Sequence, residues 1–313
     1  MKAAVLTNYG ETPHYGDFDE PRASDGGRVV DVVLAAMNPS DISRTLGPGK
    51  FFMPSPALPH VVGREGVGRL GDGSLAYFGM VEWPFGAFAE RCVALPQTLM
   101  KLPEGLDPAQ AVAFGTSGTG WLALEWRGRV EAGETVLVLG ASGTVGEIAV
   151  QAAKLLGAGR VVAVGRSADG LERAARRGAD ATVRIGGVED LGQAVAEACE
   201  GGFDLALDPL WGEPLAQVLG AAKRDARIVQ IGQSAGAAVS LPSGPIRGKM
   251  LSILGHTNGN VPAELRERAL RTMFEHAAAG RLEVEVERLP LSEVASAWER
   301  QKRSPGAKLV LVP

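Results

Sequence analysis

The sequence predicts an α/β protein in which a doubly wound parallel sheet is inserted into a mainly antiparallel β domain. Short strand patterns separated by glycine and proline turns fill the first hundred residues. Buried strand patterns then alternate with helical patterns from residue 134 to residue 231, which is typical of βαβ units. The tail returns to strands and helices outside this alternation, so we expect it to complete the first domain.

The amino-terminal part begins with strand patterns at residues 2–6 and 28–37. Glycines are frequent between residues 63 and 86, and prolines gather at residues 48–59, where we expect an irregular loop. Short strands bounded by such turn residues predict a small antiparallel sheet.

The middle part has the clearest alternation. We expect helices at residues 145–156, 171–177 and 191–199. The expected strands lie at residues 134–139, 160–164, 181–185, 203–207 and 226–231. Short connections between these elements predict a parallel sheet with right-handed crossovers.

The tail is expected to hold a helix at residues 262–279, a strand at 282–289, a helix at 292–302 and a strand at 308–312. We therefore assign residues 112–257 to the parallel-sheet domain. Residues 1–111 and 258–313 would form one discontinuous domain around it.

Composition excludes several classes of protein. Of the 313 residues 45% are hydrophobic, which is enough to bury real cores and excludes intrinsic disorder. Cys92 and Cys199 are too few for a disulfide scaffold or a four-thiolate zinc lobe. The net charge of −4 argues against nucleic-acid binding. Neither a signal peptide nor an apolar run of about 18 residues is present, so we expect a cytoplasmic protein with no membrane partner.

The segment from Gly140 to Gly146 (GASGTVG) directly follows a strand pattern and opens a helical one. Glycines in this place allow a tight turn and a close approach of the backbone to a pyrophosphate, which would meet free N–H groups at the helix N-terminus. An ordinary glycine-rich turn is the alternative. The context favours a Rossmann-type domain that binds a dinucleotide.

The end of the next strand bears on the choice of cofactor. An NAD site usually has an acidic residue there, which binds the ribose hydroxyls. Here the strand runs into Gly165, Arg166 and Ser167, and the first acid is Asp169. A guanidinium and a hydroxyl suit a 2′-phosphate, so NADP(H) is favoured over NAD(H). The alternative is that Arg166 is a solvated loop residue.

Several segments follow one another in the order found in a known family. They are AAMNPSD (35–41), PHVVGREGVG (59–68), GAFAE (86–90), FGTSGTGWLAL (114–124), the glycine loop, GAD (178–180) and GAKLVL (306–311). By these motifs the chain resembles the medium-chain dehydrogenase/reductase superfamily, in its zinc-independent NADPH:quinone oxidoreductase branch, the zeta-crystallin-like one. The resemblance implies a GroES-like catalytic domain beside the Rossmann-type domain. It also implies a homodimer through the edge of the cofactor-domain sheet, near the apolar residues 250–254.

The resemblance also bears on zinc. Zinc-dependent relatives have a cysteine where this chain has Asn38 and a histidine where it has Arg64. Catalytic zinc needs three protein ligands, and a guanidinium is permanently cationic. Glu65 is left as a partner of Arg64 or as a structural acceptor. The resemblance therefore implies a protein without zinc or another metal.

The resemblance assigns roles to individual residues. Asn38 would lie beside the nicotinamide and the substrate, with Ser43 as a second residue of the substrate pocket, while Asp41 would orient neighbouring backbone. Turn or packing roles are the alternatives. The residues expected to contact the cofactor are Asn38, Thr119, Ser142, Gly143, Thr144, Val145, Arg166, Ser167, Ile231, Gly232, Gln233, Leu254, Gly255, His256 and Lys308.

These features predict an oxidoreductase that transfers a hydride from NADPH to a quinone or a similar electron-poor carbonyl acceptor. Many double-bond reductases of the superfamily have a tyrosine proton donor in their second half, but this chain has no tyrosine after Tyr77. An alkenal, enone or enoyl double-bond reductase is the alternative enzyme. A catalytically idle NADPH-binding sensor or structural protein is the alternative of another class. Phe51, Phe52 and Trp83 would line an apolar pocket or pack in the core.

Overall fold

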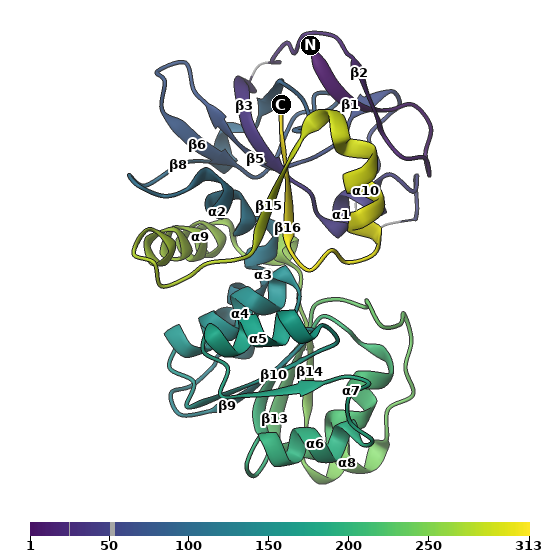
Figure 1. Ribbon diagram of the computed structural model, residues 1–313, viewed down its shortest axis with the longest axis vertical. Coiled ribbons are helices and arrows are strands. Elements are labelled where there is room, and N and C mark those ends of the chain that lie inside the picture. The colour runs from purple at the N-terminus through teal and green to yellow at the C-terminus, as the bar shows by residue number, and fades with distance from the viewer. Residues whose placement is uncertain (25, 51–53) are drawn as a thin grey trace. The chain divides into compact units, whose positions relative to one another are not determined.

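The computed structural model describes residues 1–24, 26–50 and 54–313, and this part of the chain forms two compact units (Figure 1). The first unit comprises Met1–Thr116 and Met273–Pro313, and the second comprises Ser117–Thr272. The second unit holds a parallel sheet and interrupts the chain of the first, which is mainly antiparallel. The predicted fold class is confirmed.

The described residues of the first unit form two sheets. A three-stranded sheet has the order β2-β1-β4, and a seven-stranded sheet has the order β15-β16-β3-β5-β6-β8, with β7 also paired to β3. Their pairs are antiparallel except for β15 with β16. The strands are β1 (Lys2–Leu6), β2 (His14–Asp17), β3 (Arg28–Ala36), β4 (His60–Val61), β5 (Gly66–Arg69), β6 (Leu75–Phe78), β7 (Arg91–Ala94), β8 (Leu99–Lys101), β15 (Val286–Pro290) and β16 (Lys308–Val312).

Helices α1 (Pro39–Arg44), α2 (Pro108–Ala113) and α10 (Val294–Lys302) also belong to the first unit. In α10 the residues Val294, Ala297 and Trp298 are spaced by three and four positions, so they lie on one face of the helix. All three are buried in the same core as residues of β3 and β16. Burial of this face fixes α10 against the sheets.

The second unit is built on a six-stranded parallel sheet with the order β11-β10-β9-β12-β13-β14. Every residue of β9 is buried, because a parallel sheet is covered on both faces. The winding reverses between β9 and β12, and ligands of such sheets bind at the carboxyl ends of these strands. The strands are β9 (Thr135–Leu139), β10 (Arg160–Gly165), β11 (Ala181–Arg184), β12 (Phe203–Asp208), β13 (Ala222–Gln230) and β14 (Ser252–Gly255).

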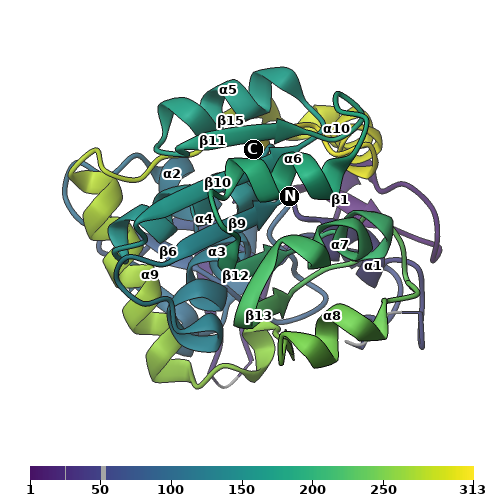
Figure 2. The same cartoon turned by 90° about the horizontal axis from the view of Figure 1, so that it is seen from below.

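Helices cover both faces of this sheet (Figures 1 and 2). Helices α4 (Thr144–Leu155) and α5 (Ala168–Arg176) lie on one face, and α6 (Leu191–Ala198), α7 (Gly212–Val218) and α8 (Ser243–Gly248) lie on the other. The chain enters the second unit through α3 (Thr119–Leu122) and a π-helical turn (Ala123–Gly128), and it leaves through α9 (Ala263–Ala278). No helix of the described residues is long and apolar enough to span a membrane.

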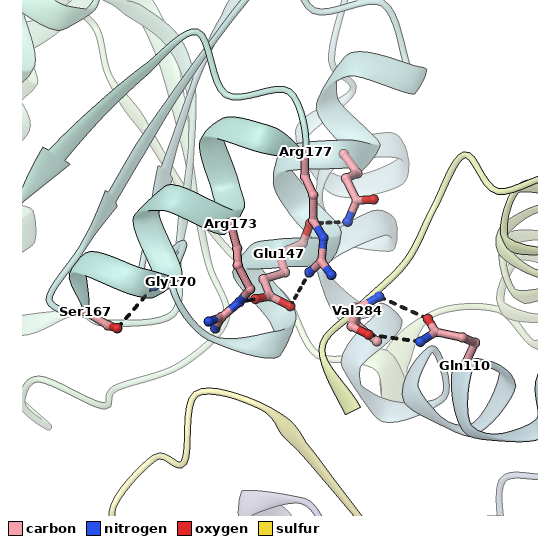
Figure 3. A network of polar contacts seen from close by, with 8 residues as sticks. Gln110, Glu147, Ser167, Gly170, Arg173, Arg177 and Val284 are labelled. Carbon is pink, nitrogen blue, oxygen red and sulfur yellow. Dashed lines mark hydrogen bonds and ion pairs between the residues drawn. The ribbon is translucent and has the colours of Figure 1, made fainter. Parts of the chain in front are cut away.

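The strand expected at residues 282–289 begins later, at Val286. The side chain of Gln110 explains the difference, because its amide takes the place of a neighbouring strand at Val284 (Figure 3). Gln110 Nε2 donates to Val284 O at 2.9 Å, and Val284 N donates to Gln110 Oε1 at 3.0 Å. Leu282 and Val284 are nevertheless buried, which explains why their apolar side chains give this segment the pattern of a strand.

Candidate functional site

A buried polar network connects several distant parts of the first unit. Asn38 precedes α1, Lys308 begins β16, and Glu65 directly precedes β5. We call the set joined by these contacts the Asn38 network. Its members are Asn38, Asp41, Arg64, Glu65, Tyr77, Thr116 and Lys308.

Asn38 lies at the centre of this network and is 1% exposed. Its Nδ2 donates to Glu65 Oε1 at 2.8 Å and to Ala36 O at 3.3 Å, while its Oδ1 accepts from Lys308 Nζ. Its backbone N–H donates to Asp41 Oδ2 at 2.8 Å, which orients the start of α1. The amide is engaged on both sides, so donation to a substrate would require one of these bonds to open.

Glu65 is the common acceptor of the network and is fully buried. In addition to the bond from Asn38, it accepts from Tyr77 Oη at 3.1 Å, Thr116 N at 2.9 Å and Thr116 Oγ1 at 2.8 Å. Hydrogen bonds to a carboxylate offset the free energy lost when its charge leaves water. Arg64 does not pair with Glu65 directly but donates to Thr116 Oγ1 at 2.7 Å. The Thr116 hydroxyl therefore bridges the guanidinium and the carboxylate.

Burial governs the ionisation of two members of the network. Burial raises the pKa of Asp41 to about 6, although the charge of Arg64 and the bond from Asn38 act in the opposite direction. Burial lowers the pKa of Lys308, while the charges of Glu65 and Asp41 raise it. The first unit thus holds charged groups away from water and compensates them with one another.

Ser43 and Thr119, two further residues expected near the substrate or the nicotinamide, lie on short helices. The Ser43 hydroxyl, in α1, donates to Pro39 O at 3.1 Å, as serine hydroxyls often do within helices. Thr119 is half-buried and begins α3. Their places in a substrate or cofactor site remain predictions.

The aromatic residues expected in a pocket fall into two groups. Phe51 and Phe52 lie outside the described residues. The ring centroid of Trp83 lies 5.9 Å from the Arg44 guanidinium and 5.3 Å from the ring of His60. Trp83 packs against the core of the first unit, which matches the packing alternative.

The glycine loop, residues 140–146, joins β9 to α4 in the second unit. Because α4 begins at Thr144, the N–H groups of its first turn have no acceptor within the helix. A Cβ atom on Gly146 would lie 2.5 Å from Ala141 Cα, so the loop and helix approach closely only with glycine here. The half-buried residues of the loop are Gly140, Ser142, Gly143, Thr144 and Val145. This turn presents N–H groups that suit an anion.

Two arginines lie beside the carboxyl end of β10. Arg166 and Ser167 follow this strand, and Ser167 caps α5 by accepting from Gly170 N at 3.2 Å (Figure 3). Arg184, the last residue of the neighbouring strand β11, donates from Nε to Arg166 O at 3.2 Å. Both arginines are exposed. The sequence pattern predicts both strands, but it does not predict which residues their pairing brings together. Arg184 was therefore not among the expected cofactor residues, and the pairing of β10 with β11 places it beside Arg166.

The residues expected on the nicotinamide side come together at the ends of β13 and β14. Gln230 pairs with Gly255, and His256 N donates to Gln230 O at 2.9 Å. Ile231, Gly232 and Gln233 therefore follow one strand while Leu254, Gly255 and His256 close the next. The arrangement agrees with the expected grouping, and cofactor contact there remains a prediction.

A buried acid at the end of β12 was not foreseen. Asp208 Oδ1 accepts from the N–H groups of Leu210 and Trp211, both at 2.9 Å, and burial raises the pKa of this carboxyl. Its Oδ2 has no hydrogen-bond partner among the described residues. Trp211 has a φ of 55°, a strained value for a bulky residue. The sequence could have pointed to this residue, because the expected strand at residues 203–207 is followed directly by an acid. That strand, β12, lies where the winding of the sheet reverses.

The helix after the glycine loop is braced from within. Glu147 of α4 is 1% exposed and accepts from Arg173 Nε at 2.7 Å and from the Arg177 guanidinium at 2.8 Å (Figure 3). These ion pairs join α4 to the end of α5. They fix the helix whose N-terminus the loop presents.

Known proteins resemble this chain in sequence and in fold. Residues 144–275 match the family described as zinc-binding dehydrogenase. Quinone oxidoreductase-like protein 2 of Mus musculus is 29% identical over 72% of this chain and 66% of its own length, so just under two thirds of that relative is covered. Acrylyl-CoA reductase of Ruegeria pomeroyi is 26% identical over 80% of this chain and 78% of its own. The quinone oxidoreductase of Thermus thermophilus, solved also as a complex with NADPH, is 28% identical with a TM-score of 0.82 over 100% of both chains.

Proposed function

Because the chain belongs to the medium-chain dehydrogenase/reductase superfamily, in its quinone-oxidoreductase-like branch, we propose that it transfers a hydride from NADPH to a quinone or a similar electron-poor carbonyl acceptor. One observation carries the proposal. The chain shares its fold over the full length with a quinone oxidoreductase solved with NADPH.

The second unit has residues that suit both the pyrophosphate and the 2′-phosphate of NADPH. The first turn of α4 offers N–H groups to the pyrophosphate, and the close approach at Gly146 keeps the turn tight. Arg166 and Arg184 lie together beside Ser167, where a 2′-phosphate would be recognised by guanidinium groups. When bound, the cofactor would supply the hydride from C4 of its dihydronicotinamide ring.

The first unit does not fit a catalytic zinc. Such a metal is held by three side chains of the His, Cys, Asp or Glu type, and the described residues form no group of three placed for one. Asn38 is bonded to Glu65 and Lys308, and the Arg64 guanidinium is a permanent cation without a free lone pair. We propose a zinc-independent reaction. Elemental analysis that finds tightly bound zinc at one ion per chain would contradict it.

The state of Tyr77 favours a quinone over an alkene. Reduction at a carbon atom benefits from a positioned acid, whereas a reduced quinone takes its protons from water. The Tyr77 side chain is 6% exposed and its hydroxyl donates to Glu65. It is therefore engaged inside the first unit and is not positioned as a proton donor for a substrate.

An NADPH-dependent double-bond reductase is the second candidate. The likeness to acrylyl-CoA reductase of Ruegeria pomeroyi favours it, because that relative is covered over most of its length. An acyl thioester or enone would use the same hydride but would need a proton at carbon.

An acceptor panel separates the two candidates. We expect loss of NADPH absorbance with 1,4-benzoquinone and 9,10-phenanthrenequinone, and little with 2-alkenals or acrylyl-CoA. Turnover of the alkenals or the thioester alone would overturn the choice of quinone. Binding of NADPH without turnover of any acceptor would support a sensor or structural protein instead.

The edge of the parallel sheet supports a homodimer as part of the proposal. Strand β14 is the last strand in the sheet order, and Met250 and Ile253 of this region are 56% and 36% exposed. An exposed apolar edge strand favours pairing with another chain. Gel filtration at micromolar concentration should give a dimer, and Ile253→Lys should give a monomer. A monomeric parent protein would contradict this.

A further inference from the structure

Arg64 occupies a position that the surrounding chain fixes closely. It follows Gly63, whose φ is 88° and whose missing Cβ makes room for the ring of Phe88. It precedes Glu65 and the buried strand β5. The backbone at Arg64 is therefore set by packing on both sides, and its side chain starts from a defined place.

Within the Asn38 network, Arg64 and Thr116 are the members nearest to solvent. Both are half-buried, whereas Asn38, Glu65 and Lys308 are at most 4% exposed. The other two members are also buried, and these are Asp41 and Tyr77. A molecule that approaches the network from solvent therefore meets the guanidinium and the Thr116 hydroxyl first.

The guanidinium of Arg64 has donors to offer. It carries five N–H bonds, and one of its nitrogens donates to Thr116 Oγ1 at 2.7 Å. The described residues provide no other hydrogen bond to it. The Thr116 hydroxyl hydrogen is directed to Glu65, at 2.8 Å. Arg64 is thus anchored at one side and open at the other, unlike Asn38, whose amide is engaged at both ends.

The charges around Arg64 favour a negative oxygen. Arg64 lies among Arg44, Lys308 and the carboxyl groups of Asp41 and Glu65, and its guanidinium is itself a permanent cation. Most of these groups are buried, so water screens the charge of Arg64 weakly. A fixed cation in such surroundings stabilises charge that develops on a neighbouring atom during a reaction.

We propose that Arg64 is a catalytic residue that holds the carbonyl oxygen of the acceptor and stabilises it as an oxyanion. The inference rests on the proposed function and deepens it, because it restricts substrates to acceptors with a conjugated carbonyl oxygen. The acceptor gains one hydrogen and two electrons as a hydride, and NADPH is oxidised to NADP⁺. The oxyanion bonded to Arg64 then takes its proton from water, so no tyrosine acid is needed.

The catalytic role of Arg64 can be tested by substituting it and measuring kcat and the Kd for NADPH. We expect Arg64→Met to lower kcat about a hundredfold or more, as removal of one oxyanion donor does, while the Kd for NADPH stays unchanged. Arg69→Met is the matched control, because Arg69 is exposed at the end of β5 and donates only to Gly73 O among the described residues. Arg64→Lys keeps the charge if the apolar variant folds poorly, and it should retain part of the rate. Added guanidinium ion should restore activity to Arg64→Ala and leave Arg69→Ala unchanged, which a structural role would not produce.

A binding measurement judges Arg64 without any turnover. 4-Nitrophenol changes its absorption when it ionises, and we expect the parent protein to bind it as the phenolate and to lower its apparent pKa. Arg64→Met should lose this effect, and Arg69→Met should keep it. Equal rates and equal phenolate binding in the parent and Arg64→Met would overturn the inference while the proposed function stands. A parent protein that turns over no carbonyl acceptor would overturn both the proposed function and the catalytic role of Arg64 that rests on it.

Discussion

The Asn38 network and the glycine loop are built in opposite ways, one from side chains and the other from backbone. The network gathers side chains from positions 38, 41, 64, 65, 77, 116 and 308 and keeps most of them away from water. The glycine loop uses the backbone of seven consecutive residues and stays partly open to solvent. The first depends on every partner being present, and the second depends on a glycine where loop and helix approach most closely, at Gly146.

This difference decides what a substitution does in each region. Removing a partner from the network leaves buried polar groups without compensation, so stability should suffer first. Adding atoms to the glycine loop should disturb the geometry on which anion binding depends. The following experiments test whether the two regions fail in these separate ways.

The largest effect is expected from Glu65→Leu. This change removes the acceptor of Asn38, Tyr77 and Thr116 in a fully buried place and should lower the free energy of unfolding by about 3 to 5 kcal/mol, measured by urea titration. Glu104→Leu, at an exposed acid of the same unit, should change it little. If Glu65→Leu does not accumulate as folded protein, Glu65→Gln gives a smaller loss to measure. A stability equal to that of the parent would show that the network does not depend on its acceptor.

Asp41 gives the network a pH dependence. Burial raises its pKa to about 6 from 3.8, so between about pH 4 and pH 6 the folded protein binds a proton that the unfolded chain has released. The resulting stabilisation is fully present below about pH 4 and is lost as the pH rises through 6, by about 3 kcal/mol in total. Asp41→Asn should remove this loss, so its unfolding free energy relative to the parent should rise across that interval.

Asp19→Asn, at an exposed position, is the control for the pH experiment. Urea titrations of the parent and both variants at pH 4, 5, 6 and 7 separate the contribution of Asp41 from that of other acids. A parallel course of the parent and Asp41→Asn would show that the carboxyl titrates normally.

Gly146→Ala should damage the glycine loop. The new Cβ would lie 2.5 Å from Ala141 Cα and would also meet Gly140 O, so backbone must move at a cost of about 1 to 3 kcal/mol. The same change at Gly143 is the control for folding, since the nearest atom to its Cβ would be Gly140 O at 3.7 Å. We expect a lower melting temperature and a weaker affinity for NADPH in Gly146→Ala. Equal stability of the two variants would mean that the loop adapts freely.

The same contrast explains how far the sequence could predict the molecule. The strands and helices of the second unit follow from apolar patterns and glycines that are neighbours in the chain, and the glycine loop is one contiguous motif. The meeting of Asn38 with Lys308, 270 residues apart, depends on the pairing of β16 with β3, which no local pattern specifies. Gln110 likewise replaces a strand partner at Val284 from far along the chain.

The smallest effect is expected from a substitution of Arg184, whose side chain is held by the backbone of a neighbouring residue. This exposed side chain is fixed to the backbone of Arg166 by one hydrogen bond of 3.2 Å, so it adds a guanidinium beside a loop that already holds one. Arg184→Ala should raise the Kd for NADPH about tenfold, which is about 1.4 kcal/mol, and leave the Kd for NADH nearly unchanged, because NADH lacks the 2′-phosphate. Arg176→Ala, at an exposed arginine of α5, should affect neither. Fluorescence titration of both nucleotides measures this, and an equal loss for NADPH and NADH would mean that Arg184 supports the loop rather than the phosphate.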